Sequence, residues 1–157
     1  MKFFKKYKAL IGSLVISLGA GGLSALLTQS SMEKYAALRQ PPLAPPGWVF
    51  PVVWTILFIL MGVSAYWVWR SSAPARRAAL TVYAVQLAAN VAWSLLFFNA
   101  GAFLAAFFWL LALEALVGAM IVLFGRCDRR AGRLQIPYFL WVLFAGYLNL
   151  GIWALNR

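Results

Sequence analysis

The chain has 157 residues, of which 64% are apolar and 11% are charged, and its formal net charge is +11. Soluble domains average about 45–50% apolar and about 25% charged residues, so this composition indicates a membrane protein. Histidine is absent and there is one cysteine, which excludes imidazole acid–base catalysis, a Ser-His-Asp triad and His- or Cys-rich metal sites. We therefore expect no metal ion and no cofactor.

Four long stretches contain no charged residue, and a fifth contains a single glutamate. Each has at least 19 residues, and about 20 helical residues span a hydrocarbon core about 30 Å thick. The sequence therefore predicts an all-α membrane protein, a single transmembrane domain over 1–157. Its five transmembrane helices are expected at residues 9–27, 48–69, 78–98, 102–124 and 134–155.

The basic residues predict how these helices are oriented. If the helices alternate in direction, eleven of the 14 Lys and Arg residues fall on one side of the membrane. Loops rich in Lys and Arg stay in the cytoplasm, so we expect a cytoplasmic N-terminus. A cleaved signal peptide is the alternative for residues 1–27, but further spans follow it. The eleven residues are Lys2, Lys5, Lys6, Lys8, Arg70, Arg76, Arg77, Arg126, Arg129, Arg130 and Arg133.

The same basic residues bear on possible partners. On short loops they set orientation and attract anionic lipid headgroups, so membrane lipid is an expected partner. The sequence offers no stacking module and no basic groove that would bind nucleic acid. We therefore expect no nucleic-acid partner.

The connection 28–46 is the only long one. It leads into "PPLAPPGWVFPVVW" (41–54), which holds five of the seven prolines. Proline lacks a backbone donor and fixes φ, so the proline cluster cannot lie inside a helix. Long loops in compact proteins are often lids or binding segments. We expect this loop to cover a cavity; a passive connector is the alternative.

Small residues recur every four positions in two of the predicted helices. In lipid, such stripes let helix backbones approach closely. One stripe is expected to pack inside the bundle and the other against a second copy of the chain. We favour the stripe in 78–98 for a homodimer contact. The first stripe comprises Ser13, Ser17, Gly21 and Ala25, and the second comprises Ala84, Ala88 and Ala92.

Three tryptophans lie deep in the predicted spans, each with an aromatic or amide residue at helical spacing. An ordinary aromatic core would explain them. However, an unsatisfied amide is costly in hydrocarbon, so the amides should face the interior of the bundle. Aromatic planes with a few inward amides are typical of a pocket for a flat apolar ligand. The faces are Trp54 and Phe58; Gln86, Asn90, Trp93 and Phe97; and Trp141, Ala145, Leu148 and Asn149.

Glu114 lies near the middle of the predicted helix 102–124. A carboxyl group at that depth is neutral, is paired or faces a wet cavity. We expect it to hydrogen-bond to Gln86 or Asn90 as part of the structure. A functional role is the alternative.

Three sequence blocks occur in order on helices of matching length: "PPLAPPGWVFPVVWTILFILMG", "QLAANVAWSLLFF" and "PYFLWVLFAGYLNLGIWALN". Through them the chain, from about Gly19 to Asn156, resembles the translocator protein family (TspO/MBR, the tryptophan-rich sensory proteins and peripheral-type benzodiazepine receptors). The resemblance implies a five-helix bundle, usually dimeric, in a bacterial plasma membrane. It also implies that the first loop covers a cavity for porphyrins such as protoporphyrin IX or similar hydrophobic molecules.

The resemblance further implies a function and a set of ligand-binding residues. We expect a porphyrin-binding protein with a sensory or transport role in tetrapyrrole handling. The alternative is light-dependent oxidative degradation of protoporphyrin IX, in which Trp54 and Trp141 exchange electrons with the excited porphyrin. Ion-coupled transport is disfavoured because five helices cannot form an even inverted repeat. The implied binding residues are Tyr35, Pro45, Trp54, Phe58, Asn90, Trp93, Phe97, Trp141, Ala145 and Asn149.

Overall fold

The computed structural model describes residues 2–157, apart from the side chain of Lys6, and all the secondary structure in this range is helical. Five segments are long and apolar enough to cross a membrane. The predicted all-α class and the five spans are confirmed. The elements are α1 (Lys2–Thr28), the 3₁₀ turn η1 (Gln29–Ser31), α2 (Met32–Ala36), α3 (Val49–Arg70), α4 (Arg76–Ser94), the π-helical turn η2 (Leu95–Asn99), α5 (Phe103–Cys127), α6 (Arg129–Leu134) and α7 (Ile136–Leu155).

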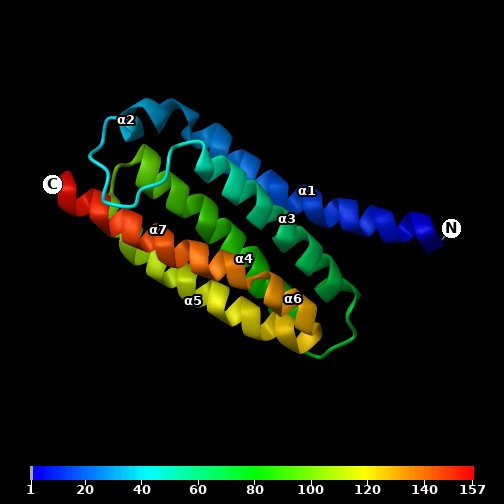
Figure 1. The fold of residues 1–157 in the computed structure, drawn as a ribbon. Coiled ribbons are helices and arrows are strands. Elements are labelled where there is room, and N and C mark those ends of the chain that lie inside the picture. The colour runs from blue at the N-terminus through cyan, green and yellow to red at the C-terminus, as the bar shows by residue number, and fades with distance from the viewer. Residues whose placement is uncertain (1) are drawn as a thin grey trace.

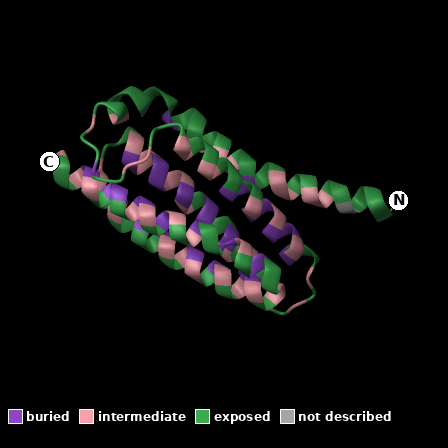
Figure 2. Cartoon of the chain, in the orientation of Figure 1, coloured by how far each residue is buried: buried purple, intermediate pink, exposed green. Residues whose placement is uncertain are grey.

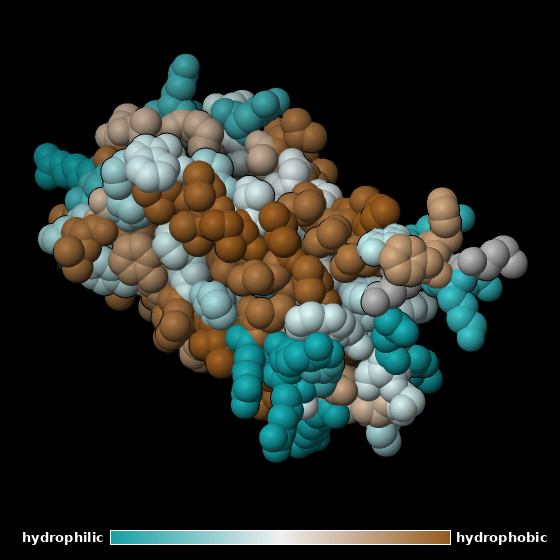
Figure 3. All heavy atoms as spheres, turned by 45° about the vertical axis from the view of Figure 1, so that its right-hand side comes forward, coloured by the Kyte–Doolittle hydropathy of each residue, from teal (hydrophilic) through white to brown (hydrophobic). Residues whose placement is uncertain are grey.

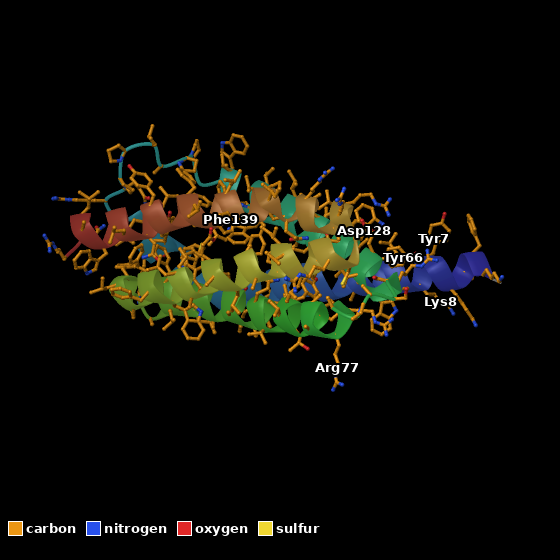
Figure 4. All side chains as sticks on the ribbon, turned by 90° about the horizontal axis from the view of Figure 1, so that it is seen from below. Tyr7, Lys8, Tyr66, Arg77, Asp128 and Phe139 are labelled. Carbon is orange, nitrogen blue, oxygen red and sulfur yellow. The ribbon has the colours of Figure 1, made fainter. Side chains whose placement is uncertain are left out.

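The long helices lie side by side in one elongated bundle (Figure 1). The N-terminus lies at one end, where the first turns of α1 project beyond the other helices, and the C-terminus lies at the other end beside α2. Apolar side chains form a wide brown surface on the bundle in Figure 3, with polar side chains gathered toward its edges. In Figure 4 the labelled Lys8, Arg77 and Asp128 lie toward the N-terminal end.

Several helices extend further than predicted. The first begins at Lys2 rather than at residue 9, because lysine is a good helix former and its charge reaches water beyond the apolar span. The predicted connection 28–46 also contains the helical turn α2, and α3 begins at Val49. The non-helical segment between them is therefore 37–48. The predicted last helix, 134–155, is preceded by α6 and divided from it at Gln135.

Asp128 explains why α6 starts where it does. Its side chain accepts the backbone N–H of Arg130 at 2.8 Å, which caps the N-terminus of α6. The Arg130 guanidinium also donates to the same carboxylate, and these hydrogen bonds hold the pKa of Asp128 below its ordinary value. The cap therefore joins α5 and α6 by a single residue.

The small residues of α1 pack against α3, as one of the two stripes was expected to do. Ser13 Oγ donates to the Gly62 carbonyl oxygen at 2.6 Å. A Cβ atom on Gly62 would lie 2.7 Å from Ser17 Oγ, and one on Gly21 would lie 2.6 Å from the Phe58 ring. Close backbone approach therefore joins these two helices.

The second stripe lies on the outside of the bundle. Ala84 and Ala88 are exposed and Ala92 is half-buried. Figure 2 shows that the buried residues lie on the inward faces of the helices, whereas most of α1 is exposed. Ala84 and Ala88 thus lie on the outer surface of α4, and a homodimer through it remains a prediction.

Candidate functional site: an aromatic cavity within the helix bundle

A cavity of about 410 Å³ lies between α1, α3, α4 and α7, with residues of α2 and η2 also in its wall. Its volume falls within the range of about 300–1,000 Å³ that is typical of ligand pockets. Nine of the ten residues predicted as ligand-binding line it, and Pro45 does not; Pro51, in the first turn of α3, lies there instead. The nine are Tyr35, Trp54, Phe58, Asn90, Trp93, Phe97, Trp141, Ala145 and Asn149.

Aromatic rings line much of this cavity, and several of them stack on one another. Trp93 and Phe97 stack with ring centroids 5.3 Å apart, and Trp54 and Phe58 stack at 5.7 Å. Each pair is separated by four residues on one helix, which places both rings on the same face. Stacking fixes the ring planes, so the walls are set before any ligand arrives.

Asn149 fixes the orientation of the Trp93 indole. Its side-chain oxygen accepts the Trp93 Nε1–H at 3.1 Å, and its Nδ2 donates to the Phe103 carbonyl oxygen at 2.8 Å. One buried amide therefore ties α7 to both α4 and α5. As expected for an amide at membrane depth, both ends of this side chain are satisfied.

Asn90 belongs to a second buried network at the cavity wall. Its Nδ2 donates to the Tyr138 hydroxyl at 2.8 Å, and that hydroxyl donates to Gln86 Oε1 at 2.7 Å. The Tyr138 ring also meets Trp54 edge-on, with centroids 6.1 Å apart. The network joins α4 to α7, and its Tyr138 ring packs against the Trp54 indole of the cavity wall.

Two polar atoms in the cavity wall have no hydrogen-bond partner within the described residues. They are Trp141 Nε1 and Ser24 Oγ, and both are buried. The Trp141 ring is held between Phe50 and Phe144, with centroids 5.9 and 5.6 Å away. A buried donor without a partner is costly, and a small rotation of either side chain toward the cavity would let it donate to an acceptor atom of a ligand.

The non-helical segment 37–48, here called the strap, crosses the end of the bundle where the chain terminates (Figure 1). Arg39 N–H donates to Asn156 Oδ1 and Asn156 Nδ2 donates to the Arg39 carbonyl oxygen, both at 2.9 Å. Tyr147 donates its hydroxyl to the Pro42 carbonyl oxygen at 2.6 Å. The strap is thus fastened to the C-terminal end of α7 at two points.

Close packing completes this attachment. Pro41 is buried against Gly151, where an added Cβ would lie 2.6 Å from the proline ring. Leu43 then turns the chain with φ of 71°, a left-handed conformation that is unfavourable for leucine. Before the strap, the Tyr35 ring packs on Phe98 with centroids 5.2 Å apart. Residues 37–48 are therefore an ordered segment held against α7, and none of them lines the cavity.

The chain matches the TspO/MBR family model over residues 13–154. It belongs to this family. It is 37% identical to protein CrtK of Rhodobacter capsulatus over 142 residues, covering 87% of this chain and 86% of that protein. It is 34% identical to tryptophan-rich protein TspO of Chlorobaculum tepidum (94% of each chain) and 34% identical to the translocator protein of Bos taurus (92% and 88%). Membership of the TspO/MBR family implies a small hydrophobic ligand.

One site prediction for this TspO/MBR protein is wrong. Glu114 does not hydrogen-bond to Gln86 or Asn90, because both amides bind Tyr138. Its carboxyl oxygens are buried with no partner among the described residues, and its side chain lines a separate groove between α5 and α7. Helical position alone did not show which side of α7 the carboxyl group faces.

The contribution of α1 to the TspO/MBR cavity was not predicted from the sequence. Gly21, Gly22 and Ser24 line it, as does Phe50 at the start of α3. The signal was present in the small-residue stripe of the first helix, which we interpreted as packing alone. Gly21 serves both purposes, because it admits the Phe58 ring and leaves space beside it.

Proposed function

We propose that this TspO/MBR protein binds porphyrins such as protoporphyrin IX, and similar flat hydrophobic molecules, in the cavity within the helix bundle. The observation that carries the proposal is that indole rings from three helices, Trp54, Trp93 and Trp141, line one cavity of about 410 Å³. Large flat rings gain favourable contact by stacking on or meeting aromatic faces. A sensory or transport role in tetrapyrrole handling follows from such binding.

The polar groups of the cavity suit an acidic porphyrin. Protoporphyrin IX carries two carboxyl groups at one edge of an apolar macrocycle. Trp141 Nε1 and Ser24 Oγ are donors without a partner in the described structure, and they lie in an otherwise aromatic and aliphatic wall. A carboxyl oxygen bonded there would satisfy buried donors that the protein leaves unpaired.

The orientation of the protein in the membrane is part of the proposal. We place the N-terminus in the cytoplasm of a bacterial cell, with the whole chain as one domain in the plasma membrane. The support is the basic end of the bundle, where Arg77 and Lys8 lie opposite the strap (Figure 4). The strap and cavity then face away from the cytoplasm.

Tryptophan-fluorescence titration with protoporphyrin IX tests the binding proposal. Wild-type protein, Trp54→Phe and Trp141→Phe are compared with Trp69→Phe, whose indole is 62% exposed and lies outside the cavity. We expect both cavity variants to bind about tenfold more weakly, or about 1.4 kcal/mol, and the control to match wild type. Equal affinity for all four proteins would contradict the proposed site.

Light-dependent degradation of the porphyrin is a second candidate. It is favoured by the Trp54 indole, which lies at the cavity and 6.1 Å from the buried Tyr138 ring. An electron can pass from such an indole to an excited porphyrin without any acid–base residue. Illumination of the complex in air should bleach the Soret band, and more slowly in Trp54→Phe. Equal bleaching rates in wild type, Trp54→Phe and Trp141→Phe would contradict the degradation candidate, and only the binding proposal would stand.

A homodimer through the outer face of α4 completes the proposal. Ala84 and Ala88 give a flat, exposed surface that permits close helix approach. In a Cys127→Ser background, cysteine at position 84 or 88 should crosslink between copies in membranes. Cysteine at Ile56, exposed on α3, is the matched control. Crosslinking that is no stronger than this control would contradict the contact.

A further inference from the structure

A second concave site lies on the opposite side of α7 from the cavity. It is a groove of about 170 Å³ between α5 and α7, and none of the described residues lines both sites. Ala145 faces the cavity, whereas the next residue, Gly146, lines the groove. The groove walls include Leu111 and Leu143, whose side chains are 51% and 52% exposed. The groove therefore opens on the outer, apolar surface of the bundle, where lipid lies in a membrane.

Glu114 is the charged residue of this groove. It lies near the middle of α5, and both carboxyl oxygens are buried without a hydrogen-bond partner in the described structure. Tyr147 also lines the groove, but its hydroxyl already donates to the Pro42 carbonyl oxygen. An unpaired carboxylate in an apolar environment is costly, so this group is neutral or is paired with a cation from outside the protein.

We propose that the groove binds a lipophilic amine from the bilayer, with its ammonium group paired to the Glu114 carboxylate. Charge complementarity selects this class of ligand, because a carboxylate in a low-dielectric site pairs most strongly with a cation that can also donate hydrogen bonds. The alkyl part of the amine lies along Leu111 and Leu143. Gly146, without a side chain, widens the groove.

Carbodiimide labelling tests access to the groove. Dicyclohexylcarbodiimide enters bilayers and adds to carboxyl groups, and mass spectrometry separates the products because the chain has only 3 Asp and Glu residues. In reconstituted protein, Glu114 should be modified, and N,N-dimethyldodecylamine, a tertiary amine that cannot couple to the activated carboxyl group, should slow that modification about tenfold, equivalent to about 1.4 kcal/mol. Dodecanol, which has the same chain and no charge, should protect much less. Absence of modification at Glu114, or equal protection by both compounds, would overturn the proposal.

Direct binding provides a second test. A dansyl-labelled alkylamine should bind wild-type protein about tenfold more tightly than Glu114→Gln, which keeps the shape of the side chain and removes the charge. Gly146→Ala should also weaken binding, because the new methyl group meets Leu110 at an ordinary 3.9 Å and narrows the groove without disturbing the fold. Equal affinity in wild type and Glu114→Gln would overturn the proposal.

Protoporphyrin titration of the same variants controls for folding. Neither residue lines the cavity, so Glu114→Gln and Gly146→Ala should bind the porphyrin as wild type does. Failure of the wild-type protein to bind porphyrin would count against the proposed function and leave the amine site untouched. The two proposals can therefore fail separately.

Discussion

The two faces of α7 differ in how the polar side chains that lie against them are hydrogen-bonded. On the cavity face, Asn149 is bonded at both ends, to Trp93 and to Phe103. On the groove face, α7 lies against Glu114, whose carboxyl oxygens have no partner in the described chain. The difference shows that an amide with both ends hydrogen-bonded fixes the position of an aromatic ring. A buried carboxyl group without a partner is instead available to bind a cation from outside the protein.

Replacement of Asn149 should have the largest effect on this comparison. Asn149→Leu keeps the branched shape of the side chain but removes its hydrogen bonds to the Trp93 Nε1–H and the Phe103 carbonyl oxygen. Each such group costs about 1–3 kcal/mol when buried, so we expect the free energy of unfolding to fall by about 2–5 kcal/mol. Denaturation in detergent measures it. Glu114→Gln is the matched control, since no hydrogen bond is lost there, and an equal loss in both variants would abolish the distinction between the faces.

Gly151→Ala should have an intermediate effect that is confined to the strap. The added Cβ would lie 2.6 Å from Pro41, so the strap must move away from α7. We expect amide hydrogen exchange in residues 38–44 to rise severalfold while α3 and α4 keep their protection. Gly146→Ala, five residues earlier and in ordinary contact, is the control. Unchanged hydrogen exchange in the strap would show that its packing on Gly151 of α7 does not determine the stability of the strap.

Tyr147→Phe should have the smallest effect. The ring stays against the groove, but the hydroxyl bond to the Pro42 carbonyl oxygen at 2.6 Å is lost. A hydrogen bond of this kind contributes about 0.5–1.5 kcal/mol, so porphyrin release should be faster by at most about tenfold. Stopped-flow dissociation measures it. Slower release would contradict the view that this bond holds the strap closed.

Much of the fold could be predicted because the membrane imposes simple rules. Four charge-free stretches and a fifth with a single glutamate predicted the five spans, and helical spacing placed Trp54, Asn90 and Trp141 at one cavity. Their positions depend on local periodicity, which the sequence shows directly. The absence of helix at the prolines of 41–46 also followed from the conformational limits of proline.

Features that depend on contacts between distant segments could not be predicted. Gln86 binds Tyr138 of α7, whereas Glu114 lines the groove between α5 and α7, and no periodicity reveals this. The bonds between Arg39 and Asn156 join residues 117 positions apart. The share of α1 in the cavity depends on how closely Gly21 lets Phe58 approach. Tertiary packing decides each of these.

A structure of the protein with protoporphyrin IX bound would test the central claim most directly. We predict that the macrocycle lies inside the cavity among Trp54, Trp93 and Trp141, with a carboxyl oxygen within hydrogen-bond distance of Trp141 Nε1. A porphyrin bound on the outer surface of the helices, with the cavity unchanged, would contradict it.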